Sequence, residues 1–114
     1  MKYALLIHPG DTAARVAELS AEEQKQIMDE WITVAQSPGV LAAQQLHPVD
    51  TATTVRVADG RTLTIDGPFI EAKEAIGGVM LLEADDLDGA ISFAARIPVA
   101  RLGGAVEVRP VVER

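Results

Sequence analysis

The segment KYALLIH, residues 2–8, is a predicted β-strand with apolar side chains on both of its faces. Successive residues of a strand point to opposite faces of a sheet. One face therefore carries Tyr3, Leu5 and Ile7, and the other carries Ala4 and Leu6. Strands of this kind are typical of the middle of a sheet that is covered on both sides. We expect this strand to lie at the centre of the fold.

The first amphipathic helix is predicted over residues 21–36. Ser20 and Glu23 form a capping box, in which two side chains three residues apart satisfy the first free N–H groups of a helix. The apolar residues Ile27, Met28, Trp31, Val34 and Ala35 then recur at helical spacing. The sequence Ser-Pro-Gly at residues 37–39 ends the helix.

A second helix and five further strands complete the predicted elements. The helix begins at Asp85 or Asp86 and ends before Pro98, because proline lacks the N–H that a helix needs. Its apolar stripe consists of Leu87, Ala90, Ile91, Ala94 and Ala95. The strands are predicted at residues 43–48, 53–57, 63–65, 77–83 and 105–112. Asp59-Gly60 is a hairpin turn that joins the strand at 53–57 to the next one.

The order of these elements predicts an α+β fold. If the hairpin at residues 53–66 is treated as an insertion, the order is β-α-β-β-α-β within a single domain, residues 1–114. Right-handed crossovers then place both helices on one face of an antiparallel, ferredoxin-like sheet. The other face stays bare, and a large apolar patch on a monomer marks a contact surface. We therefore expect a homodimer in which two sheets pack face to face.

Composition excludes several classes of function. The 114 residues contain no cysteine, which excludes disulfides, thiolate zinc sites and thiol nucleophiles. This absence is compatible with a reducing cytoplasm, where we expect the protein to act. The net charge of −7, without clustered Lys or Arg, argues against nucleic-acid binding. No apolar stretch approaches the roughly 18 residues that a membrane span needs.

The segment RTLTIDGPFIEAKE, residues 61–74, is the part of the chain that ordinary packing explains least. It starts as a strand and stops at Asp66, because Gly67 can adopt positive φ and Pro68 withholds a hydrogen-bond donor. Beyond the turn, one aromatic residue is followed by the charged residues Glu71, Lys73 and Glu74.

This segment resembles the signature of the YCII-related proteins, in particular the DGPF-domain branch. The matching residues are Asp66-Gly67-Pro68-Phe69, Glu71, Lys73-Glu74 and Gly77-Gly78, and the resemblance extends to residues 1–7 and 106–110. It implies a dimeric α/β barrel. Family members are often encoded beside alternative sigma factors, which implies a sigma factor as a protein partner.

One departure from the family pattern concerns the catalytic base. Enzyme-like members of the wider YCII group rely on a His/Asp pair, with the histidine associated with the first helix. Residues 21–36 of this chain contain no histidine. A substitute base would therefore have to be His8, His47, Asp66 or Glu74.

The candidate catalytic residues are Asp66, His47 and Glu74. Asp66 ends a strand beside open backbone, where a carboxylate acts either as a general base or as a cap on the turn. His8 and His47 are the only histidines, and each is predicted to end a strand before a proline. A histidine can shuttle protons near neutral pH. No histidine spacing typical of a metal site is present, so no metal is expected.

The candidate substrate-binding residues are Lys73, Phe69 and His8. Lys73 is expected either to hold a substrate anion or to pair with Asp66, although loop charges also form weak ion pairs. Phe69 is expected to anchor the loop by packing. Glu107 and Arg109 share one face of the last strand, where a cross-strand pair is favoured over a role in lining a dimer cavity.

These residues support two classes of function. The first is a small-molecule enzyme that performs acid–base catalysis of the isomerase or lyase type. No phosphate-loop, nucleophile-elbow or metal motif is present, so no cofactor is expected. The second is a non-catalytic binding or regulatory protein linked to an alternative sigma factor. The sequence does not decide whether the protein is an enzyme.

Overall fold

The computed structural model describes residues 1–71 and 74–114. Its strands are β1 (Lys2–His8), β2 (Val40–Gln45), β3 (Thr53–Ala58), β4 (Arg61–Asp66), β5 (Gly78–Glu83) and β6 (Ala105–Pro110). Its helices are α1 (Thr12–Ala17), α2 (Ala21–Ala35) and α3 (Leu87–Ala94), with 3₁₀ turns η1 (Val49–Thr51) and η3 (Pro98–Arg101). None of the helices in these ranges is long and apolar enough to cross a membrane.

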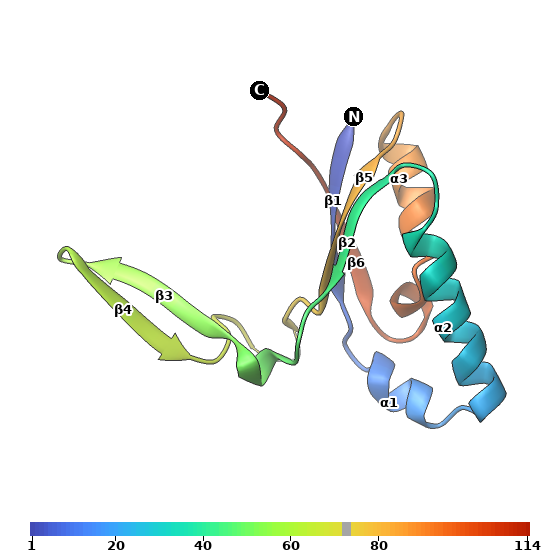
Figure 1. The fold of residues 1–114 in the computed structure, drawn as a ribbon, viewed down its shortest axis with the longest axis horizontal. Helices are drawn as coiled ribbons and strands as arrows, with labels where there is room; N and C mark the ends of the chain where they lie inside the picture. The colour runs from blue at the N-terminus through green and yellow to red at the C-terminus, as the bar shows by residue number, and fades with distance from the viewer. Residues whose placement is uncertain (72–73) are drawn as a thin grey trace.

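The main sheet has the ferredoxin-like strand order that the sequence predicts. The four strands lie in the order β2-β5-β1-β6, and every neighbouring pair is antiparallel. The long helices α2 and α3 cover one face of this sheet, and the opposite face has no helix over it (Figure 1). We call this second surface the helix-free face.

The strand β2 starts three residues earlier than predicted. The sequence placed this strand at residues 43–48, but it runs from Val40 to Gln45. Gly39 adopts a φ of 93°, and the N–H of Val40 donates to the carbonyl of Ser37, so the helix turns directly into the strand. His47 consequently lies two residues beyond the end of β2 and does not terminate it.

The core lies between the sheet and the two long helices. Tyr3, Leu5 and Ile7 of β1 are buried there together with Met80 and Leu82 of β5. The helical side contributes Val34, Ala90, Phe93, Ile97 and Val99, with Trp31 packed at the margin. On the helix-free face, Ala4 and Leu6 remain half-buried within one chain. The two faces of β1 therefore differ in burial, and the face toward the helices is the more buried one.

The predicted capping box is present at the start of α2. The Oγ of Ser20 accepts from the N–H of Glu23 at 3.1 Å, and the Glu23 carboxylate accepts from the N–H of Ser20 at 3.3 Å. These bonds satisfy two N–H groups at the start of the helix that have no helical partner.

We expect Ser20→Ala to lower the free energy of unfolding by about 1 kcal/mol, because the N–H of Glu23 loses its acceptor. Urea unfolding followed by circular dichroism measures this change. Ser92→Ala is the matched control, since Ser92 is an exposed serine within α3 and caps no helix, and it is expected to cost less. Equal stability of Ser20→Ala and the unmodified protein would contradict a capping role.

The hairpin β3–β4 is formed as predicted, but it projects away from the sheet. Asp59 and Gly60 adopt φ values of 50° and 74°, as a two-residue hairpin turn with positive φ at both positions requires. The hairpin extends on the helix-free side of the molecule, and we call residues 53–66 the arm (Figure 1). The radius of gyration is 16.1 Å, against about 13 Å for a compact domain of this length.

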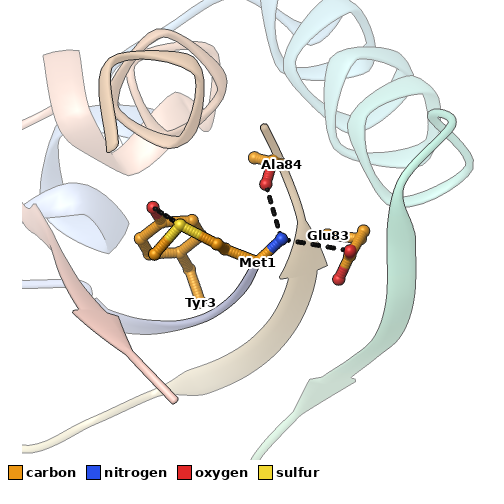
Figure 2. A network of polar contacts seen from close by, with 4 residues as sticks. All are labelled: Met1, Tyr3, Glu83 and Ala84. Atoms are coloured by element: carbon orange, nitrogen blue, oxygen red, sulfur yellow. Dashed lines mark hydrogen bonds and ion pairs between the residues drawn. The ribbon is translucent and has the colours of Figure 1, made fainter. Parts of the chain in front are cut away.

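The far end of β1 is held to β5 by the amino group of Met1. This group donates to the carboxylate of Glu83 at 3.1 Å and to the carbonyl of Ala84 at 3.0 Å (Figure 2). The hydroxyl of Tyr3 donates to the sulfur of Met1 at 3.6 Å. These contacts fix the N-terminal end of β1, whereas His8 lies at its C-terminal end.

Candidate functional site

His8 is placed by the end of β1, where Pro9 removes the next hydrogen-bond donor from the ladder. Its Nδ1 lies 3.0 Å from the backbone carbonyl oxygen of Glu74. A carbonyl can only accept a hydrogen bond, so the bond requires the proton on Nδ1. The ring is thereby oriented by the main chain, and Nε2 is left to face the opposite direction.

Glu107 of β6 faces this second nitrogen. In the β1–β6 register, Glu107 lies opposite Leu6, one diagonal step from His8 on the helix-free side of the sheet. The Oε1 of Glu107 is 3.4 Å from Nε2 of His8, and its Oε2 is 3.9 Å from Nε of Arg109. The histidine side chain is only 25% exposed, whereas Glu107 is half exposed. The pair therefore lies at the surface but is partly shielded from water.

A shallow depression of about 580 Å³ opens beside this pair. It is lined by His8, Gly10, Ile70, Glu74, Gly103, Gly104, Ala105, Val106 and Glu107. Gly104 lies so close to the backbone that a Cβ there would clash with the carbonyl oxygens of His8 and Pro9. The glycine turn before β6 therefore allows the chain to pass directly over the end of β1.

The arrangement can hold and transfer a proton. When Nε2 is deprotonated, its lone pair can accept a proton from a molecule in the depression. When the ring is protonated, its positive charge pairs with the carboxylate of Glu107, 3.4 Å from Nε2. A histidine whose other nitrogen is fixed by a backbone carbonyl has a defined orientation for general acid–base catalysis.

Of the residues predicted for the site, His8 and Glu74 line the depression. Glu74 contributes its backbone carbonyl to the orientation of His8, and its side chain is exposed. Lys73, the predicted anion-binding residue, lies outside the described residues. The role predicted for the Glu74 carboxylate stays a prediction.

Asp66 and Phe69 lie at the root of the arm and do not line the depression. Asp66 pairs with Thr53 across the hairpin and is exposed. The ring of Phe69 is 73% exposed and lies 5.8 Å from the guanidinium carbon of Arg56. The sequence predicted that Phe69 anchors the loop by packing, but within one chain its ring is not packed in this way. Catalysis by Asp66 and substrate binding by Phe69 stay predictions.

His47 lies in the connection between β2 and η1 and is exposed. Its neighbour Leu46 donates a backbone hydrogen bond to Gly77 at 2.9 Å, which fixes this connection beside the start of β5. His47 is not among the residues that line the depression. Its catalytic role also stays a prediction.

A second surface hollow lies on the helical side and contains no proton-transfer pair. It is formed between α2 and the segment after α3, and its cations are engaged with the chain. Arg101 pairs with Glu30 at 2.7 Å, and Arg96 donates to Ser37 at 3.2 Å. Within residues 1–71 and 74–114, no three histidine or carboxylate side chains are placed to hold a metal ion. The depression at His8 is therefore the better candidate site.

The YCII-related domain model matches residues 1–114, the whole of the chain. The chain belongs to the YCII-related family. It is 32% identical over 117 residues to uncharacterized protein R00369 of Rhizobium meliloti (strain 1021), covering 97% of this chain and 92% of that protein. The match confirms the YCII-related family, which the sequence of this YCII-related chain had suggested through residues 61–74.

A solved structure of similar length was also found for this YCII-related chain. It is 5-chloro-2-hydroxyhydroquinone dehydrochlorinase (TftG) from Burkholderia phenoliruptrix AC1100, in complex with 2,5-dihydroxybenzoquinone. The match has a TM-score of 0.47 and 14% sequence identity, and it covers 100% of this chain and 96% of that one.

Glu107 is the residue of the site that sequence reasoning placed least well. The sequence showed it on one strand face with Arg109, and these two side chains do approach each other. Its contact with His8 depends on the register of β1 against β6, which no local pattern encodes. The available signal was weaker: a histidine at the end of the first strand, and a carboxylate on the last strand beside one other charged residue, Arg109.

Proposed function

We propose that this YCII-related protein binds a small molecule in the depression beside His8 and exchanges a proton with it without a cofactor. The observation that carries the proposal is the orientation of His8, whose Nδ1 is held by the Glu74 carbonyl while Nε2 faces Glu107. Oriented bases of this kind serve isomerases and lyases.

The chemistry that fits this pair is proton abstraction from a carbon next to a carbonyl group. Nε2 takes the proton, and the electron pair of the C–H bond moves into an enolate. Return of the proton at a second carbon gives isomerisation. Loss of a leaving group from the carbon adjacent to the enolate, with formation of a double bond, gives elimination. Glu107 stabilises the imidazolium that either route requires.

We further infer that the functional unit is a homodimer formed through the helix-free face. Ala4 and Leu6 of β1 lie on this face, and Val79 of β5 is 37% exposed there. These apolar side chains lie together at the centre of the face, and a patch of this kind marks a contact with another protein. His8 and Glu107 lie on the same face, so a second sheet would shield the depression from water.

The test is a screen for turnover with cyclic lactones and catechol-derived acids, followed by two-dimensional NMR of the labelled protein with each compound. We expect substrates to shift the amide signals of His8, Gly104 and Glu107. A compound that shifts only residues of α2 and η3 would place binding in the other hollow and contradict the proposed site.

Asp66→Asn tests whether the carboxylate of the DGPF segment takes part in the reaction. If Asp66 acts as the general base, turnover should fall by roughly 10²-fold or more, since an amide cannot accept the proton. Thr64→Ser, also on β4, is the matched control and should leave turnover unchanged. Persistent activity in Asp66→Asn would remove Asp66 from the mechanism and leave His8 as the base.

The alternative of a regulatory protein that contacts a sigma factor stays a prediction. Binding of compounds at His8 without turnover would favour a small-molecule sensor over an enzyme.

A further inference from the structure

Among residues 1–71 and 74–114, no other strand pairs with the arm. Its two strands pair only with each other, in a separate two-stranded sheet. A lone two-stranded hairpin is at best marginally stable in water. Six apolar side chains of the arm and its root are between 46% and 73% exposed, namely Val55, Val57, Leu63, Ile65, Phe69 and Ile70. The arm therefore carries a surface suited to burial.

The root of the arm fixes its direction. The N–H of Gly67 donates to the carbonyl of Ala52 at 2.7 Å, and the hydroxyl of Thr54 donates to the carbonyl of Gly67 at 2.8 Å. The arm leaves this root on the helix-free side and extends away from the sheet (Figure 1). It does not cover the face from which it projects.

We propose that each arm packs against a second copy of the chain, so that two copies clasp each other while their helix-free faces meet. This inference rests on the homodimer proposed above and adds the arm to its interface. Leu63 and Ile65 lie on one face of the arm, whereas Val55 and Val57 lie on the other. Packing of either face against the partner would bury apolar side chains that one chain leaves exposed.

The area of the interface is the first argument that the arm packs against a second copy of the chain. A four-stranded sheet with six-residue strands presents roughly 400 Å², taking about 4.8 Å per strand and about 3.3 Å per residue. A stable interface buries about 800 Å² on each partner. The arm adds roughly 200 Å² of its own face and covers a similar area of the other copy. Only with the arms does the contact reach the size that a stable dimer needs.

The charge of the arm is the second argument. Residues 53–66 contain two arginines and two aspartates, so the arm is neutral within a chain of net charge −7. Two acidic bodies repel each other. A neutral, apolar arm can approach the acidic body of a second copy without adding to that repulsion, and it offers no charge complementarity to a strongly charged partner.

The experiment is hydrogen–deuterium exchange of the full chain at several concentrations, with its mass measured by light scattering under the same conditions. We expect the amides of β3 and β4 to exchange at least about tenfold more slowly in the dimer than in the dissociated chain. Val57→Asp and Leu63→Asp, one on each face of the arm, are expected to weaken dimerisation at least about tenfold. Gln26→Asp is the matched control, because it adds the same charge on α2, away from the arm.

The outcomes separate this inference from the homodimer itself. A stable dimer whose arm amides exchange as fast as in the dissociated chain, and whose mass is unchanged in both arm variants, would overturn the clasp and leave the dimer intact. A monomer at all concentrations would overturn both. Turnover in the His8 variants tests the proposed reaction separately from both results.

Discussion

Replacement of His8 by asparagine is expected to reduce turnover by roughly 10²–10⁴-fold, the range that general acid–base catalysis contributes. The asparagine amide nitrogen takes the place of Nδ1 and can still donate to the Glu74 carbonyl, so the end of β1 keeps its contact. The atom that is lost is Nε2, which faces Glu107. The measurement is kcat and KM for the best compound of the screen.

His8→Gln is the complementary variant, because its amide nitrogen reaches the position of Nε2 but cannot exchange a proton near neutral pH. A substrate-binding role for Nε2 would be partly rescued by glutamine, mainly in KM. A proton-transfer role would be lost in both variants, mainly in kcat. Turnover within a few-fold of the unmodified protein in His8→Asn would exclude His8 as the base.

Glu107→Gln and Arg109→Gln form a matched pair on β6. Both replace a charged side chain by the same amide, but only Glu107 contacts His8. Loss of the carboxylate removes the partner of the imidazolium, so we expect the larger loss of kcat in Glu107→Gln. Equal effects of the two changes would indicate that the charge of the strand, rather than the pair with His8, controls the reaction.

Much of the fold could be predicted from local sequence patterns, because helix caps and hairpin turns are each determined by a few neighbouring residues. The Ser20 and Glu23 side chains cap α2 as their spacing predicts, and Asp59-Gly60 forms the turn of the arm. The start of β2 was misplaced, because the sharp turn at Gly39 lets the strand begin without a loop. Residues 12–17, to which the sequence assigned no defined element, form the short helix α1.

The site was harder to predict, because its two proton-carrying groups come from opposite ends of the chain. His8 ends the first strand and Glu107 lies in the last, and only the antiparallel pairing of β1 with β6 brings them together. The DGPF motif at residues 66–69 predicted a site at Asp66 and Phe69, but these residues lie at the root of the arm and not in the depression beside His8. A local motif revealed the family, whereas the proton-transfer pair depends on contacts between distant residues.

The second large effect is expected in the core, where Leu5→Ala should lower the free energy of unfolding by roughly 2–5 kcal/mol. Leu5 lies on the central strand and is completely buried between the sheet and the helices. Truncation removes apolar contacts and leaves a cavity that neighbours such as Ile97, itself fully buried, cannot fill. This loss is a large part of the ~5–15 kcal/mol that stabilises a typical domain.

Leu6→Ala is the matched control for this change, since it makes the same truncation one residue away on the helix-free face. Leu6 is only half-buried in one chain, so the variant should cost less than Leu5→Ala when the protein is dilute. Because a dimer gains stability with concentration, the cost of Leu6→Ala should rise as the helix-free faces associate, whereas that of Leu5→Ala should stay constant. Urea unfolding at two protein concentrations separates the two behaviours. A cost for Leu6→Ala that does not change with concentration would mean that β1 is not covered by a second sheet.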